Sequence, residues 1–240
     1  MPEPPAPLHE LDKDLSVVVT DGWRTGFPGA RVGLLRVDNV VNQPASVLLQ
    51  RRTERIEAEL RQRFASADRA SLAALPTIQA YQRHYRAFGQ TYHVLRQLES
   101  VALKGTRLVS PSGLVLAMFA AELDSLLLTA GHDVDALQPP LVVDRSVADE
   151  RFVGLGGREQ VVRAGDMLMR DHGGIISAVV YGPDQRTRLV GHTRRALFTT
   201  YAPAGVHADQ VLRHLDQLGA LVRLAAPEAE VRFQGLCPGG

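Results

Sequence analysis

The chain has 240 residues, of which 45% are hydrophobic and 22% are charged, and this length is enough to bury one substantial core. Its formal net charge of +1 excludes the global cationic field that drives nonspecific nucleic-acid binding, so any RNA affinity must come from a local patch. A single cysteine, Cys237, excludes an intramolecular disulfide framework and a cysteine-based zinc site.

The two ends of the chain differ in composition from the middle. Residues 1–14 carry acids and prolines where a signal peptide needs basic residues and an apolar core. We expect this segment to be a flexible arm, residues 15–225 to form one domain, and residues 226–240 to form a frayed tail. No apolar run is long enough to span a membrane, so we expect a cytoplasmic protein without a membrane partner.

Strand and then helix patterns occupy the first half. Residues 16–20 and 31–37 are rich in valine and leucine, and the glycines and proline between them predict a turn. Over residues 46–64 leucine and isoleucine recur at helical spacing with charges gathered on another face, which predicts an amphipathic helix. Further helices are predicted at 69–75, 77–88 and 92–103.

The second half is richer in strand patterns. Residues 112–128 are apolar almost all round, which predicts a helix buried in the centre of the domain. A final helix is predicted at 207–224. Short apolar runs between them predict strands at 141–147, 151–155, 166–171, 174–182 and 196–202. A helical half followed by a strand-rich half indicates an α+β fold, with helices packed on a mixed β-sheet.

The segment 181–202 places charged residues between two predicted strands. Arg186 and Arg188 alternate along it, so their side chains are expected to project to the same side, at a spacing that suits a phosphate or a carboxylate. A solvated edge strand with salt bridges would have the same pattern. Both interpretations stay open.

His132 and Asp184 are the first candidates for chemistry. His132 lies between Gly131 and Asp133, and a histidine beside a carboxylate can act as a general base with a raised pKa. The alternative is a helix end, with Gly131 in the left-handed conformation as the cap. Asp184 is either a site residue or a turn residue that follows a proline.

A second polar cluster lies at the end of the 77–88 helix. Arg83, Tyr85 and Arg86 offer cations and an aromatic ring to a ligand, but arginines there would also complement the helix dipole. Ser110 and Ser112 precede the buried helix, where their hydroxyls would cap it.

Other kinds of site have no sequence support. The chain shows no Ser-His-Asp set, phosphate loop or zinc spacing, and the glycines at 154–157 predict a turn. We therefore expect no metal site, and the sequence names no cofactor. We expect a pocket between the C-terminal end of the 112–128 helix and the 181–188 loop, because both carry polar residues at the ends of apolar elements.

Five motifs follow one another between residues 17 and 221. They are a helix end, a long apolar helix, a glycine with an Asp-x-Asp turn, a Gly-Gly pair, and an Arg-Thr-Arg segment ahead of an Ala-Leu-Phe strand. Outside the long helix their residues are Tyr85, Arg86, Phe88 and Gly89; Gly131, Asp133 and Asp135; Gly156 and Gly157; and Arg186, Thr187 and Arg188 with Ala196, Leu197 and Phe198. This order resembles the freestanding relatives of the B3/B4 domain, the editing domain of the phenylalanyl-tRNA synthetase beta subunit.

The resemblance implies a domain that binds an aminoacyl-tRNA and hydrolyses a wrongly joined amino acid without a covalent intermediate. A pocket would orient water onto the ester carbonyl, with backbone donors near Gly182 and help from the ribose hydroxyl of the tRNA. In that family a pocket histidine lies in the loop that contains His132 here, although its counted position falls on Ala130. A glutamate that recognises the amino acid lies in the loop that here holds Tyr181 and Asp184.

The resemblance thus assigns catalysis to His132, Asp184 and Tyr181. The binding residues that it implies are Arg83, Tyr85, Arg86, Ser110, Ser112, Gly182, Arg186, Thr187 and Arg188. The run before Tyr181 lacks the arginines, tryptophans and asparagine of the relatives, which suit base stacking, so we expect tRNA binding to be weak and steeply salt-dependent. The alternatives are a repurposed pocket for a free amino acid or related metabolite, with or without a cofactor, and a non-catalytic binding module. The oligomeric state is not indicated.

Overall fold

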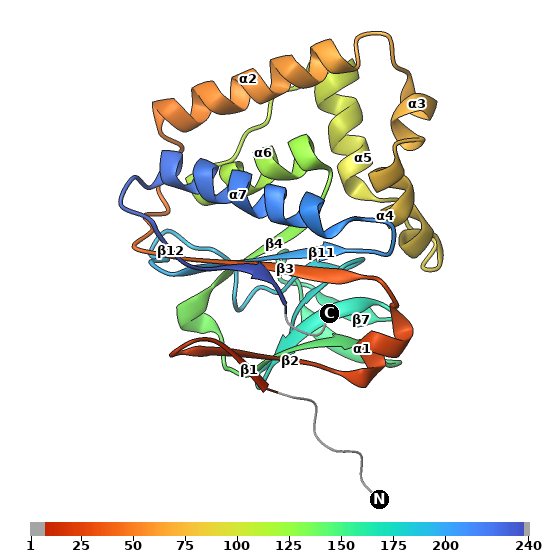
Figure 1. Ribbon diagram of the computed structural model, residues 1–240, viewed down its shortest axis with the longest axis vertical. Coiled ribbons are helices and arrows are strands. Elements are labelled where there is room, and N and C mark those ends of the chain that lie inside the picture. The colour runs from red at the N-terminus through yellow and green to blue at the C-terminus, as the bar shows by residue number, and fades with distance from the viewer. Residues whose placement is uncertain (1–7, 238–240) are drawn as a thin grey trace, which may run out of the picture.

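The computed structural model describes residues 8–237. The protein is built in three layers. A layer of helices covers one face of a four-stranded antiparallel sheet, and a six-stranded sheet lies on the opposite side (Figure 1). Helices α6 (Gly113–Ser125) and α7 (Ala208–Ala225) pack on the first sheet, and α2 (Val47–Arg63) lies over these two helices. This is the predicted α+β class, with helices packed on β-structure.

The first sheet has the strand order β12-β3-β11-β4. Its members are β12 (Glu230–Leu236), β3 (Arg31–Asp38), β11 (Ala196–Ala202) and β4 (Leu128–Asp133). Every residue of β11 and β4 is buried, because the helices cover one side of these strands and the second sheet covers the other.

The second sheet has the order β1-β2-β5-β8-β9-β10 and is mixed, since β2 and β5 are parallel while the other pairs are antiparallel. Its members are β1 (Leu8–Asp12), β2 (Leu15–Val19), β5 (Leu141–Arg145), β8 (Met167–Asp171), β9 (Gly174–Ala178) and β10 (Gly182–Pro183). A separate hairpin joins β6 (Glu150–Val153) to β7 (Glu159–Val162). It contains the predicted turn at 154–157.

Shorter helices complete the fold. They are α1 (Asp21–Gly26), α3 (Arg69–Ala73), α4 (Pro76–Arg86) and α5 (His93–Leu98), which continues as a π-helical turn at Glu99–Leu103. The sequence predicted a turn where α1 lies. The helix forms because the Thr20 hydroxyl accepts a hydrogen bond from the backbone N–H of Trp23, and the indole is buried in the core.

The buried helix α6 begins as predicted and ends early. The Ser112 hydroxyl caps it by accepting from the backbone N–H of Val115 at 3.2 Å, as the sequence predicted for this serine. Leu126 then adopts a left-handed conformation (φ 63°), and the chain turns directly into β4. Gly131 is therefore not a helix cap, because pairing with β11 holds residues 128–133 extended.

Both terminal segments contribute strands, contrary to the predicted arm and tail. Within the predicted 1–14 arm, β1 pairs with β2; within the predicted 226–240 tail, β12 pairs with β3. Backbone hydrogen bonding to an existing strand edge outweighs the weak propensity of these polar segments. Residues 1–7 and 238–240 of those predictions lie outside the described part of the chain.

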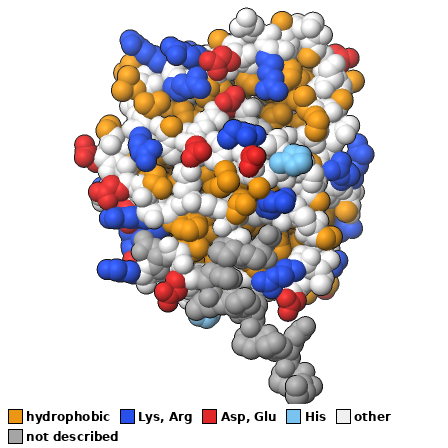
Figure 2. Space-filling view, viewed as in Figure 1, with side chains coloured by type: hydrophobic (Ala, Val, Ile, Leu, Met, Phe, Trp, Pro, Cys, Tyr) orange, Lys and Arg blue, Asp and Glu red, His pale blue; other side chains and the backbone are white. Residues whose placement is uncertain are grey.

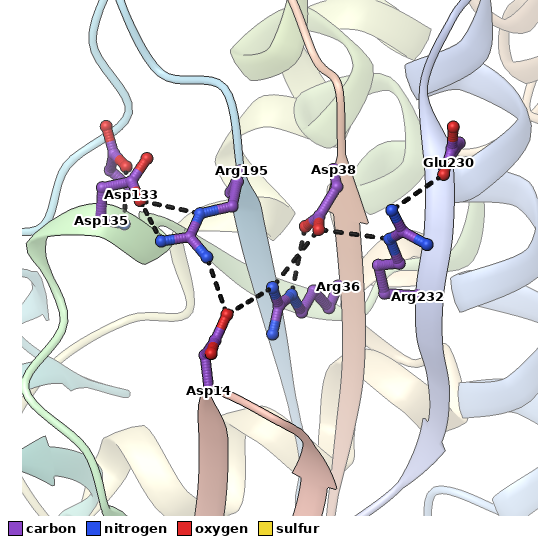
Figure 3. Close-up of polar contacts among 8 residues, drawn as sticks. All are labelled: Asp14, Arg36, Asp38, Asp133, Asp135, Arg195, Glu230 and Arg232. Atoms are coloured by element: carbon purple, nitrogen blue, oxygen red, sulfur yellow. Dashed lines mark hydrogen bonds and ion pairs between the residues drawn. The ribbon is translucent and has the colours of Figure 1, made fainter.

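A network of ion pairs ties the two sheets together (Figure 3). Arg36 of β3 is almost fully buried and contacts both carboxylate oxygens of Asp38, at 3.1 and 3.3 Å. Asp14, in the turn between β1 and β2, accepts from Arg195 at 3.0 Å and lies 3.8 Å from Arg36. The network continues to Asp135, Arg232 and Glu230.

We predict that the buried and exposed acids of this network contribute very unequally to stability. Asp38→Asn removes a carboxylate that contacts a buried guanidinium through both oxygens, so the free energy of unfolding should fall by about 3 kcal/mol. Asp14→Asn should cost less than about 1 kcal/mol, because its side chain is 60% exposed. Denaturant titrations of both variants give the two values, and equal losses would contradict the assignment.

Candidate functional site

A cavity of about 370 Å³ opens between α6, β4 and the 181–189 segment, where the sequence predicted a pocket. Most of its wall is apolar. The apolar side chains include Val115, Met118 and Phe119 of α6, Leu128 and Ala130 of β4, and Leu189. The polar side chains are Glu122, Thr129, Ser177, His93, Tyr181, Arg188 and Tyr201. A largely apolar cavity with a few polar groups is the usual form of a small-ligand site.

Three of the predicted site residues line this cavity: Tyr181, Gly182 and Arg188. Tyr85 contributes from behind the wall, because its buried hydroxyl donates to the backbone carbonyl of Val179 at 2.6 Å. Burial raises the pKa of Tyr85 well above its ordinary value, so this phenol stays neutral. The role of Tyr85 is thus to hold the cavity wall.

His132 and Asp184 lie close together but outside the cavity lining. His132 Nδ1 is 2.8 Å from the hydroxyl oxygen of Thr187, and that hydroxyl donates to the Asp184 carboxylate. Because the threonine proton is used in this way, we infer that His132 carries its own proton on Nδ1. Asp184 also accepts from the backbone N–H of Thr187, so the three side chains form one closed structural cluster.

The structure gives His132 a lowered pKa, where the sequence predicted a raised one. The residue is fully buried, and desolvation lowers the pKa of its imidazole to about 3. The predicted rise in pKa required an exposed imidazole near a carboxylate. Strand pairing with β11 instead places His132 opposite Leu197 in the core. His132 lies outside the cavity lining, and an imidazole with a pKa of about 3 is a weak base.

Arg186 and Arg188 do not form one anion site. Arg186 makes two hydrogen bonds to the buried carboxylate of Asp171, at 2.6 and 3.1 Å, and a third to the backbone carbonyl of Ala136. Arg188 lines the cavity, where its guanidinium donates to the carbonyl of Gln185 and, among the described residues, makes no ion pair. Of these two arginines, Arg188 is the one available to an anionic ligand at the cavity.

The cluster at the end of α4 lies beside a separate shallow groove. Arg83 donates to the carbonyl of Ala204 at 3.3 Å, and Arg86 donates to Gln82 at 3.4 Å, so neither is paired with an acid in the described part of the chain. Ser110 accepts from the backbone N–H of Ser112 and lies away from the cavity lining. Both serines therefore serve the start of α6.

Among the cavity residues that the sequence did not predict, Glu122 and His93 carry a carboxyl group and an imidazole. Glu122 lies within the apolar helix α6, and His93 begins α5. The signal for Glu122 was a carboxylate inside the otherwise apolar run 114–123, whereas Asp124, the other acid of α6, follows that run. His93 gave no such signal. Its ring packs against Tyr85 and Tyr92 and makes no hydrogen bond among the described residues.

The side chain of His93 is exposed and lines the cavity. Desolvation in the cavity wall lowers its pKa, and the positive charge of Arg96 lowers it further. His93 is thus an accessible imidazole that stays neutral near pH 7, as a general base requires.

No group of three or more His, Cys, Asp or Glu side chains in residues 8–237 is placed to hold a metal ion. Within the same residues no helix combines the length and the apolar character needed to cross a bilayer.

The similarity of this chain to known proteins lies among solved structures. No family model matches the chain, and no curated protein matches it. The chain is similar to an N-terminal fragment of the phenylalanyl-tRNA synthetase beta subunit from Pyrococcus horikoshii, at 13% identity and a TM-score of 0.47. The match covers 98% of this chain and 58% of that one.

We predict that two buried histidines make the protein acid-sensitive. Burial lowers the pKa of His132 to about 3 and that of His214 to about 4, whereas an unfolded histidine titrates near 6.5. Below pH 6.5 the unfolded state therefore takes up protons that the folded state excludes, so the free energy of unfolding falls as the pH drops. Each of the two histidines should lower the free energy of unfolding by roughly 1.4 kcal/mol for each pH unit below 6.5.

The measurement is denaturant unfolding between pH 5 and pH 7 for the wild type, His132→Gln and His214→Gln. Each variant should lose its share of the pH dependence, while His172→Gln, at an exposed position, should keep the wild-type slope. Identical slopes in all four proteins would show that the buried histidines do not titrate on unfolding.

Proposed function

We propose that the cavity binds the amino-acid part of an aminoacyl-tRNA and that the protein hydrolyses the ester in trans. The observation that carries this proposal is the cavity itself, which offers an apolar wall for a side chain and gathers Glu122, His93 and Arg188 around it. The order of the sequence motifs supports the choice of substrate.

Each polar group has a distinct part in the proposed reaction. Arg188 binds the anionic end of the ligand, because its guanidinium has donors to spare. His93 takes a proton from the attacking water, because its imidazole is accessible and stays neutral near pH 7. Gly182, which lines the cavity at φ 83°, leaves open space where a side chain would stand. Because water attacks the ester directly in this proposal, hydrolysis needs no covalent intermediate.

Contacts with the tRNA itself are expected to be few. Arg83 and Arg86 lie on the same helix as Tyr85, which supports the cavity wall, so they are the arginines best placed to meet a phosphate. On the face seen in Figure 2, cationic and acidic side chains are interspersed and do not gather into one patch. Affinity should therefore be modest and fall steeply with salt.

A free amino acid or related metabolite is the second candidate. The observation in its favour is Arg188, whose unpaired guanidinium matches a free carboxylate as well as a phosphate. The two candidates differ in whether tRNA is needed for activity.

Substituting the two neighbouring arginines separates binding from structure. Arg188→Ala should weaken ligand binding by about 1 to 3 kcal/mol and leave the melting temperature nearly unchanged. Arg186→Ala should instead cost about 2 kcal/mol of stability, because it leaves the buried carboxylate of Asp171 without its cation. Calorimetric titration and thermal melting of both variants give the comparison. Loss of binding in Arg186→Ala with full stability would reverse the two roles.

Deacylation of mischarged tRNA tests the function directly. We expect the wild type to release apolar amino acids from tRNA, and His93→Ala to lower the rate by about 10²- to 10⁴-fold. His172→Ala, at an exposed loop position, is the matched control and should keep the wild-type rate. If the wild type releases amino acids no faster than buffer alone and binds a free amino acid tightly, the second candidate, a free amino acid or related metabolite, would be favoured.

A further inference from the structure

Glu122 is a buried carboxyl group that pairs with no cation among residues 8–237. Its side chain lines the cavity from α6, and one oxygen accepts the backbone N–H of Thr129 at 2.8 Å. Glu57 is equally buried, at 2% exposure, but it pairs with Arg61 at 3.0 Å and accepts a second bond from Leu108. Burying a carboxylate without a partner costs several kcal/mol, so Glu122 must hold a proton or meet a cation.

The described part of the chain does not supply that cation. Arg188 lines the same cavity, but its guanidinium donates to the carbonyl of Gln185 and makes no ion pair with Glu122. The other titratable groups near Glu122 are the phenols of Tyr81, Tyr85, Tyr92 and Tyr201 and the imidazoles of His93 and His214. Burial raises the pKa of each of these phenols and lowers the pKa of both imidazoles, so all six are neutral near pH 7.

We propose that Glu122 binds the ammonium group of the ligand, so that the cavity selects primary amines with an apolar body. The inference rests on the proposed use of this cavity as the ligand site. Val115, Met118 and Phe119, which share helix α6 with Glu122, provide apolar contacts for the rest of such a ligand. The ammonium would give Glu122 an ion pair in addition to its one hydrogen bond, which comes from the backbone N–H of Thr129.

Binding of a cation at this position is coupled to loss of a proton. Burial raises the pKa of Glu122 to about 8, so the empty cavity holds a protonated carboxyl at pH 7. An ammonium ion needs the ionised form, and its binding therefore releases close to one proton. Affinity should rise roughly tenfold per pH unit between pH 6.5 and 7.5 and level off above pH 8.

The opposite ligand chemistry would have the opposite pH dependence. A protonated Glu122 could donate a hydrogen bond to a carbonyl or carboxylate, and such a ligand would bind less tightly as Glu122 ionises. Amines and carboxylates with similar apolar groups therefore show whether Glu122 binds an ammonium ion or donates a hydrogen bond to the ligand.

The experiment is calorimetric titration of the full chain with two amines, 2-phenylethylamine and isoamylamine. The same titration is made with 3-phenylpropionate and 4-methylpentanoate, which are carboxylates with similar apolar groups. The amines should bind at least tenfold more tightly than their carboxylates. Repeating the titration in two buffers of different ionisation enthalpy counts the released proton. Glu122→Gln, which keeps an oxygen for the Thr129 N–H, should lower amine affinity by roughly 10- to 100-fold.

Glu57→Gln is the matched control, because it removes an equally buried carboxylate outside the cavity, and it should leave amine binding unchanged. The inference is overturned if neither amine binds the wild type, if carboxylates bind as well as amines, if affinity falls with rising pH, or if Glu122→Gln binds normally. Amine binding that depends on Glu122 without any deacylation would contradict the proposed function alone. Deacylation that is insensitive to Glu122→Gln would contradict this inference alone.

Discussion

The pairing of β4 with β11 is the constraint on which the rest of the site depends. β11 is buried along its whole length and pairs on its other edge with β3, so β4 must follow its register. Because β4 begins three residues after α6 ends, that register also sets where the last turns of α6 lie. Glu122 and Thr129 are thereby brought within hydrogen-bonding distance at the cavity wall.

The same pairing decides which polar groups are available for function. His132 Nδ1, Thr187 and Asp184 are hydrogen-bonded to one another in the core, and Arg186 is occupied by Asp171. These groups have little capacity left for a ligand. Glu122, His93 and Arg188 are the cavity side chains that could accept new partners, and this spare capacity is the physical basis of the functional assignment.

Several residues of the sequence motifs make contacts that stabilise the fold. Tyr85 holds the carbonyl of Val179, and Asp133 accepts from the Thr193 hydroxyl at 2.7 Å and from the backbone N–H of Asp135. Arg186 and Thr187 anchor the segment that runs beside β4. A recurring pattern of this kind indicates which elements meet in the fold, and it does not by itself indicate which side chains meet a ligand.

The sequence alone determined the elements whose pattern is local. The amphipathic period of α2, the apolar run and serine cap of α6 and the apolar strands of the second half were all readable, because a helix or a strand imposes its own spacing on the residues within it. Tertiary structure decided the remainder. Strands β1 and β12 form only because partner edges from distant parts of the chain accept them, and His132 is neutral only because a strand pairing buries it. The cavity likewise joins α5, α6, β4 and the 181–189 segment, which are far apart in sequence, so the partners and the hydration of each side chain are set by contacts that no local pattern records.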